Sequence, residues 1–169
     1  TFPRIILAEV NTHRMFSRNS ASSRAIPFEK MVKMVEENPF IPIKWMKDHK
    51  GMQGSEYFNH ESEIEQLTHG WLTSRDNALF QCKKLSESGL TKQIVNRLLE
   101  PFMWHTAIIT ATDFENFFAL RNHEAAEIHL QELAKLMMLA YNDSKPKLLN
   151  EGEWHIPFGD NLKDEYVVD

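Results

Sequence analysis

Residues 12–24 read Thr12-His13-Arg14-Met15-Phe16-Ser17-Arg18-Asn19-Ser20-Ala21-Ser22-Ser23-Arg24, and the rest of the chain is best interpreted outward from them. The stretch holds three arginines, one histidine, four serines and one asparagine, and it contains no carboxylate. Apolar runs lie on both sides of it, at residues 5–8 and 25–28. Arginine forks match phosphate oxygens, and serine and asparagine add neutral donors. The pattern favours an anion-binding loop, with a solvated basic loop as the alternative.

The whole chain has 169 residues, enough for one domain with a hydrophobic core. Its net charge of -5 disfavours nucleic-acid binding through bulk charge, so the basic stretch favours a local anionic ligand. The lone cysteine, Cys82, excludes an internal disulfide and fits a reducing compartment, so we expect a cytoplasmic protein. No apolar run approaches the roughly 20 residues of a membrane span. We therefore expect no membrane partner and no nucleic-acid partner.

Apolar spacing and turn residues predict a mostly helical chain. The expected helices cover residues 3–14, 28–36, 61–88, 91–100, 114–120 and 125–142. Residues 104–112 are rich in β-branched and aromatic side chains and predict a strand. Residues 44–59 and the tail from residue 145 onward carry glycine and proline and predict irregular structure.

Three single residues of the long helical region have specific interpretations. Cys82 falls on the apolar stripe of the helix expected at 61–88, so we interpret it as a core residue and not as a nucleophile. Gly89 is expected to end that helix and Thr91 to cap the next one. The eight histidines show no spacing typical of a metal site, and neither CxxC nor HExxH occurs, so we predict no metal.

Two further arginines lie beside apolar residues. Arg97 shares a predicted helix face with Ile94 and Leu98, and Arg121 follows an aromatic run. Each arginine, taken alone, fits a snorkelling side chain or a structural ion pair. Three arginine-bearing segments in one small acidic chain favour a shared anion pocket instead.

The basic stretch resembles the signature of the flavin-dependent thymidylate synthases, the ThyX family, which reads R-H-R-x-x-S-x-N-E-x-S-x-R. The positions that agree, with no gap, are His13, Arg14, Ser17, Asn19, Ser22 and Arg24. The segment from Asn96 to Pro101 resembles the family's A-R-x-x-L-P. Leu120, Arg121 and Ala126 resemble the family's L-R-x-x-x-x-A-Q-x-E-I-R, and Asn116 matches a family asparagine. The likeness covers residues 3–141 and is greatest to the branch carried by bacterial viruses.

This resemblance implies an α+β fold of the ThyX type, mostly helical with a small antiparallel sheet, as a single domain over residues 1–169. It implies a methyltransferase of nucleotide biosynthesis that converts dUMP to dTMP by reductive methylation. Methylene-tetrahydrofolate would supply the carbon, NADPH would be the reductant, and FAD would be bound. In the family the sites form between subunits, so a homo-oligomer, a tetramer with shared sites, is implied.

The resemblance also implies roles for single residues. Arg121 would be the catalytic residue, because it corresponds to the arginine that polarises the uracil. The residues expected at dUMP are Glu9, Thr12, Ser20, Ala21, Ser22, Ser23, Arg24, Arg97 and Arg121. The residues expected at FAD are Thr12, His13, Arg14, Ser20 and Asn116. Ser22 would be a ligand of dUMP and not a covalent nucleophile.

The sequence also departs from the family pattern. Thr12 replaces the first signature arginine and Ser20 replaces the glutamate, and the family's H-x-S-P-F-E-H segment is absent. Either the chain is an incomplete family member or another arrangement completes the flavin site. A second interpretation is a non-catalytic nucleotide- or phosphate-binding relative that has lost flavin. A third is a purely helical interaction protein with a solvated basic loop.

Overall fold

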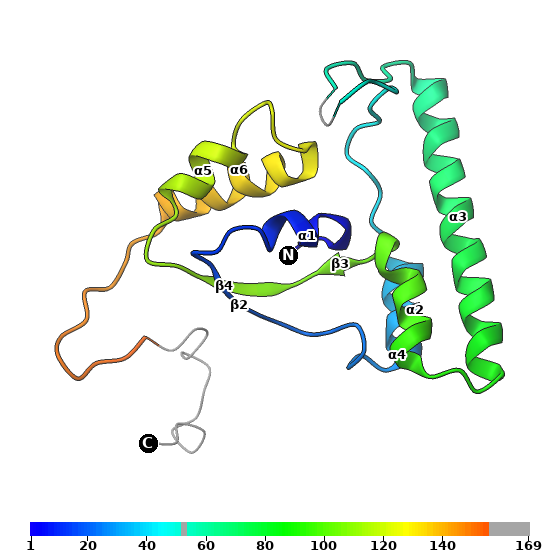
Figure 1. The fold of residues 1–169 in the computed structure, drawn as a ribbon, viewed down its shortest axis with the longest axis horizontal. Helices are drawn as coiled ribbons and strands as arrows, with labels where there is room; N and C mark the ends of the chain where they lie inside the picture. The colour runs from blue at the N-terminus through cyan, green and yellow to red at the C-terminus, as the bar shows by residue number, and fades with distance from the viewer. Residues whose placement is uncertain (52–53, 156–169) are drawn as a thin grey trace.

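The computed structural model describes residues 1–51 and 54–155 (Figure 1). The elements, in chain order, are β1 (Phe2–Pro3), η1 (Arg4–Ile6), α1 (Leu7–Val10), β2 (Ser17–Ser20), α2 (Phe28–Glu37), α3 (Glu61–Glu87), α4 (Lys92–Val95), η2 (Asn96–Phe102), β3 (Trp104–His105), β4 (Ala107–Thr110), α5 (Glu115–Arg121) and α6 (Ile128–Asp143). In Figure 1, α2, α3 and α4 lie together on one side, α5 and α6 on the other, and the β2–β4 ribbon runs between them. The expected α+β class is confirmed, and a purely helical protein is excluded.

The strands of the described residues form two antiparallel pairs, β1 with β3 and β2 with β4. In the second pair Ser17 lies opposite Thr110 and Ser20 opposite Ala107. The sequence did not predict β2, because Ser-Arg-Asn-Ser has low strand propensity and no apolar alternation, and all four residues are exposed in the structure. The backbone pairing with the apolar strand β4 stabilises β2 despite this low propensity. The strand expected at 104–112 is confirmed as two shorter strands separated by Thr106.

The helix predicted for residues 3–14 is confirmed only over residues 4–10, as the 3-10 helix η1 followed by α1, and it is wrong at Pro3 and at residues 11–14. Pro3 has extended backbone angles, φ -60° and ψ 134°, and pairs in β1. The backbone N–H of Arg4 donates to the carbonyl of Met103 at 3.0 Å. This long-range bond holds the start of the segment against η2 and β3, so only residues 7–10 are α-helical.

The long helix α3 agrees with its prediction at both ends. Gly89 has a positive φ of 84°, and the N–H of Leu90 donates to the carbonyl of Leu85 at 3.0 Å, which closes the expected glycine turn. The hydroxyl of Thr91 accepts from the N–H of Gln93 at 3.4 Å and caps α4, as expected. The helix expected at 91–100 then continues as the 3-10 helix η2. This helix contains Pro101, which has no backbone N–H to donate.

A first hydrophobic cluster joins α2, α3, α4 and η2. Its buried members among the described residues are Met31, Val32, Val35, Leu79, Cys82, Val95, Leu99, Phe102 and Met103. Cys82 is fully buried, and its thiol lies 3.4 Å from the carbonyl of Val95. Burial raises the pKa of the Cys82 thiol, which disfavours the nucleophilic thiolate. The interpretation of Cys82 as a core residue is confirmed.

A second hydrophobic cluster lies beneath the basic stretch. It consists of Phe2, Ile6, Val10, Phe16, Phe117, Leu130 and Ala134. Phe16 is the only member that comes from residues 12–24, so it ties that polar stretch to the core. Because β1, η1, α1, α5 and α6 contribute the other members, this cluster fixes where the basic stretch sits.

Helix α6 begins at Ile128, later than the predicted residue 125, because Glu127 caps it. The Glu127 carboxylate accepts from the N–H groups of His129 and Leu130 at 2.8 and 3.0 Å. Burial alone would raise the pKa of Glu127, but the hydrogen bonds from His129 and from these N–H groups hold it below its ordinary value. Within residues 1–51 and 54–155, no helix combines the length and the apolar character needed to cross a membrane.

Candidate functional site

A cavity of about 300 Å³ opens between the basic stretch and α5. It is lined by Thr12, His13, Arg14, Met15, Phe16, Asp113, Asn116, Phe117, Leu120 and Arg121. Four of the five residues expected at FAD line this cavity, and so does the expected catalytic residue, Arg121. The structure therefore brings two distant motifs of the sequence into one site.

The guanidinium of Arg121 is held by two neighbours in the basic stretch. Its Nε donates to His13 Nε2 at 2.8 Å, and its Nη2 donates to the hydroxyl of Thr12 at 3.3 Å. Thr12 in turn donates to the carbonyl of Glu9 at 2.6 Å. The threonine that replaces the first signature arginine is thus part of the support for Arg121.

The imidazole of His13 is only 9% exposed and lies between two aromatic rings. Its centroid is 4.9 Å from that of Phe117, edge to face, and 5.6 Å from that of Phe16. Burial lowers the pKa of His13, and the positive charges of Arg121 and Arg18 lower it further. The ring is therefore neutral at neutral pH, which leaves Nε2 free to accept a hydrogen bond.

Arg18 holds the backbone of the basic stretch and was not predicted as a site residue. Its Nη1 donates to the carbonyls of Val10 and His13 at 3.2 and 3.0 Å. The family signature does not specify this position, so the only signal in the sequence was one more arginine in a basic run. The role of Arg18 could not be predicted from the sequence, because the carbonyls of Val10 and His13 become neighbours only in the folded chain, where α1 ends.

The other predicted site residues do not line the cavity at Arg121. They are Glu9, Ser20, Ala21, Ser22, Ser23, Arg24 and Arg97. Most of them gather where β2 ends and where the chain turns against η2. Arg24 and Arg97 are both exposed there, as are Ser20, Ala21 and Ser22.

Asn96 and Glu100 of η2 fix this turn. The amide of Asn96 donates to the carbonyls of Ser23 and Ile26 at 2.8 and 2.9 Å, and Asn96 is fully buried. The hydroxyl of Ser23 donates to the Glu100 carboxylate. Ser23 thus anchors the turn with its side chain, while Ser22 and Arg24 on either side stay exposed.

The Glu100 carboxylate also belongs to a partly buried charge network. Arg4 Nη2 lies 3.3 Å from it, and Arg4 Nη1 lies 2.9 Å from His105 Nδ1. Burial and the charge of Arg4 lower the pKa of His105, although Glu100 acts in the opposite direction. This network connects the chain start, β3 and the turn that holds Ser23.

A solved structure has the same fold. It is a UMP/dUMP methylase, PolB from Streptomyces cacaoi, crystallised with 5-Br dUMP, with a TM-score of 0.62 and 16% sequence identity. The match covers 83% of this chain and 62% of that one, so the chain spans less than two thirds of its length. No protein-family model matches the sequence, and no curated protein matches it. Membership of the flavin-dependent family, and of its bacterial-virus branch, stays a prediction.

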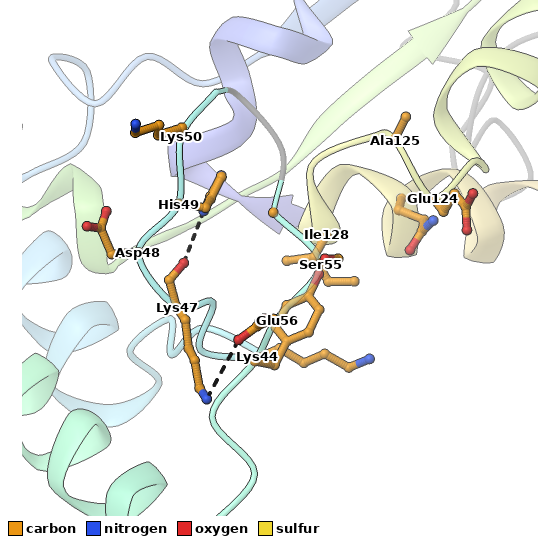
Figure 2. Close-up of a pocket in the computed structure, with 13 residues that line it drawn as sticks. Lys44, Lys47, Asp48, His49, Lys50, Ser55, Glu56, Glu124, Ala125 and Ile128 are labelled. Atoms are coloured by element: carbon orange, nitrogen blue, oxygen red, sulfur yellow. Dashed lines mark hydrogen bonds and ion pairs between the residues drawn. The ribbon is translucent and has the colours of Figure 1, made fainter.

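A larger cavity, of about 830 Å³, lies between residues 44–57 and the start of α6 (Figure 2). Three lysines, three carboxyl groups and one histidine line it: Lys44, Lys47, Lys50, Asp48, Glu56, Glu124 and His49. Lys47 Nζ lies 3.9 Å from Glu56 Oε2. Because the lysines and carboxylates balance, this cavity is a weaker candidate for an anionic ligand than the one at Arg121.

Metal chemistry has no support in the part of the chain that the structure describes. No group of three or more His, Cys, Asp or Glu side chains is placed there to hold a metal ion. His129 Nδ1 and Glu127 Oε1, 2.6 Å apart at the start of α6, form a pair and not a cluster of three. The cavity at Arg121 carries donors and aromatic rings instead.

Proposed function

We propose that the chain is a flavin-dependent thymidylate synthase. It would methylate dUMP to dTMP reductively, with methylene-tetrahydrofolate as carbon donor and NADPH as reductant. The observation that carries this proposal is the single cavity shared by Thr12, His13, Arg14, Asn116 and Arg121. These residues come from separate motifs that resemble the family's. The fold shared with a UMP/dUMP methylase supports the same substrate class.

In this proposal Arg121 binds and polarises the uracil ring. Its Nε and Nη2 already donate to His13 and Thr12, which leaves Nη1 to donate to a uracil carbonyl. A guanidinium stays charged at any working pH. It therefore stabilises negative charge that grows on the ring as the reaction proceeds.

The donors of the cavity fit a flavin. The guanidinium of Arg14 and the amide of Asn116 can donate to ring carbonyls or phosphate oxygens, and Phe16 and Phe117 give apolar walls. A volume of about 300 Å³ suits one ring system better than a whole dinucleotide. When bound, FAD would supply the hydride chemistry, while the protein supplies positioning and charge.

The dUMP phosphate is proposed to lie with Ser22, Arg24 and Arg97. These side chains are exposed on the turn and on η2, outside the cavity of their own chain. In the proposed homotetramer, they would complete the cavity of another subunit. Exposed apolar side chains beside Arg97, those of Ile94 and Leu98, support a protein interface at this face.

A second function, a nucleotide-binding relative without flavin chemistry, is favoured by two substitutions. Thr12 removes a positive charge that the signature places in the site. Its hydroxyl donates to the backbone carbonyl of Glu9 and accepts from Arg121. Ser20 removes the signature's negative charge and pairs with Ala107 in the β2–β4 ribbon. Such a protein would bind dUMP and would not bind FAD.

Two measurements separate these functions. The first is the absorbance spectrum of the purified protein with and without added FAD, followed by gel filtration to remove free flavin. The second is dTMP formation from dUMP with NADPH, methylene-tetrahydrofolate and FAD. We expect retained flavin absorbance and dTMP. Binding of dUMP with neither flavin nor dTMP would replace the synthase by the second function.

Arg24→Ala and Arg97→Ala are each expected to weaken dUMP binding by roughly 10- to 150-fold, because a charge-assisted phosphate bond contributes about 1.5–3 kcal/mol. Calorimetric titration with dUMP measures the effect, and titration with deoxyuridine, which has no phosphate, should show little change. Lys33→Ala, an exposed cation on α2, is the matched control. If both arginine variants bind dUMP as tightly as the control does, the phosphate site lies elsewhere.

A further inference from the structure

We propose that His13 is a positioning residue for Arg121, and that protonation of His13 releases the guanidinium and switches the site off. In this role His13 acts as a neutral acceptor through Nε2. The inference rests on the proposed function of the cavity, and it adds a pH-dependent control of its catalytic residue.

Two hydrogen bonds fix the plane of the Arg121 guanidinium. Nε donates to His13 at 2.8 Å and Nη2 donates to Thr12 at 3.3 Å. Because the guanidinium is planar and rigid, anchoring two of its nitrogens also sets the direction of the third, Nη1. Arg121 is the last residue of α5, and these two bonds tie its side chain to the basic stretch.

His13 is itself held too firmly to be a mobile ligand. Its ring lies between Phe16 and Phe117, and its carbonyl accepts from the Phe16 N–H at 3.2 Å and from Arg18 Nη1 at 3.0 Å. The position of Nε2 is thus set by the core and by Arg18. The geometry is that of a fixed acceptor facing a flexible donor.

Protonation would reverse this interaction. A neutral imidazole offers one acceptor nitrogen, whereas an imidazolium offers two donors and no acceptor. The charged groups that act on the ring are Arg121 from α5 and Arg18 from β2, and both are positive. Arg14 and Asp113 line the same cavity, but no carboxylate of the described residues hydrogen-bonds to the ring. An imidazolium at this position would therefore repel Arg121.

The sign of the pH dependence follows from this arrangement. Burial and the two guanidinium groups hold the pKa of His13 below its ordinary value of 6.5. The ring is then neutral at and above that pH, and Arg121 stays in place. As the pH falls further, the ring gains a proton, the acceptor is lost, and turnover falls with it.

Two substitutions separate the acceptor from the charge. His13→Gln keeps an amide oxygen that can accept the Nε–H of Arg121, and it does not titrate. His13→Leu fills the space and offers no acceptor. The control is His69→Gln. His69 is exposed on α3, and α3 contributes no residue to the lining of this cavity.

The kinetic test measures kcat and the KM for dUMP from about pH 5 to pH 8.5, in the FAD-loaded enzyme. His13→Leu is expected to lower kcat roughly 10- to 100-fold with a much smaller change in KM, because a misplaced catalytic group costs that much. His13→Gln is expected to retain most of kcat at neutral pH and to lose the acid limb of the wild-type profile. A His13→Leu variant with wild-type kcat, or a His13→Gln variant with the wild-type acid limb, would overturn the proposal.

A second readout does not depend on activity or on FAD. The imidazole nitrogens of His13 are followed by NMR during a pH titration of the protein alone, in the wild type and in Arg121→Leu. We expect the Arg121→Leu variant to raise the pKa of His13, because a nearby positive charge is removed. An unchanged titration would refute the pairing. If the wild type makes no dTMP while the pairing is seen, the proposed function has failed and the pairing of His13 with Arg121 stands.

Discussion

Arg121→Ala is expected to slow the methylation step by roughly 10²- to 10³-fold, the cost of losing one preorganised donor at a developing charge. The loss should fall on kcat more than on dUMP binding, because charge on the uracil ring is larger in the transition state than in the ground state. Arg121→Lys should lie between wild type and alanine. A lysine keeps the charge but cannot donate to His13, Thr12 and a ligand with a fixed planar fork.

The chemical step is measured as single-turnover oxidation of reduced FAD with saturating dUMP and methylene-tetrahydrofolate, beside a dUMP binding curve. The matched control is Arg75→Ala, which removes an arginine on α3 that donates to the carbonyls of Val35 and Glu36. The control should retain the wild-type rate of the chemical step. A chemical step that is unchanged in Arg121→Ala would make Arg121 a structural partner of His13, and its catalytic role would have to be withdrawn.

The sequence predicts best those parts of the fold that depend on local interactions. The ends of α3, the glycine turn at Gly89 and the cap at Thr91 all involve residues a few positions apart. The burial of Cys82 follows from helical periodicity alone. None of these features requires knowledge of which distant segment packs against the helix.

Features set by distant partners could not be predicted in this way. The segment at residues 3–14 has a helical apolar pattern, yet its first residue, Pro3, pairs with Trp104 of β3. Strand β2 forms from residues with low strand propensity because β4 lies beside it. Both cases are tertiary contacts that override a local preference.

The candidate site likewise has residues that the sequence could predict and residues that depend on distant contacts. The motif likeness selected Thr12, His13, Arg14, Asn116 and Arg121, and the fold places all five around one cavity. The residues that hold the site in shape were missed, because they act through hydrogen bonds to backbone and side-chain groups that only the fold brings near. They are Arg18, Asn96 and Glu100. The likeness also could not show that Arg24 and Arg97 lie apart from that cavity within one chain.

Phe117→Ala is expected to lower the free energy of unfolding by about 3–5 kcal/mol, as for other large aromatic side chains removed from a core. Phe117 is 3% exposed, and its ring centroid lies 4.9 Å from those of both Phe16 and His13. The substitution would open a void beside the imidazole, so His13 should lose its fixed position together with core packing.

Urea denaturation followed by tryptophan fluorescence measures this change. Phe80→Ala is the matched control, because Phe80 is 54% exposed on α3 and should change stability by only about 0.5 kcal/mol or less. The free energy of unfolding of a typical domain is about 5–15 kcal/mol, so the loss expected for Phe117→Ala should clearly shift the midpoint of the urea transition. A Phe117→Ala variant as stable as the control would mean that α5 does not pack on the basic stretch. In that case, the cavity that unites His13 with Arg121 would not exist in solution.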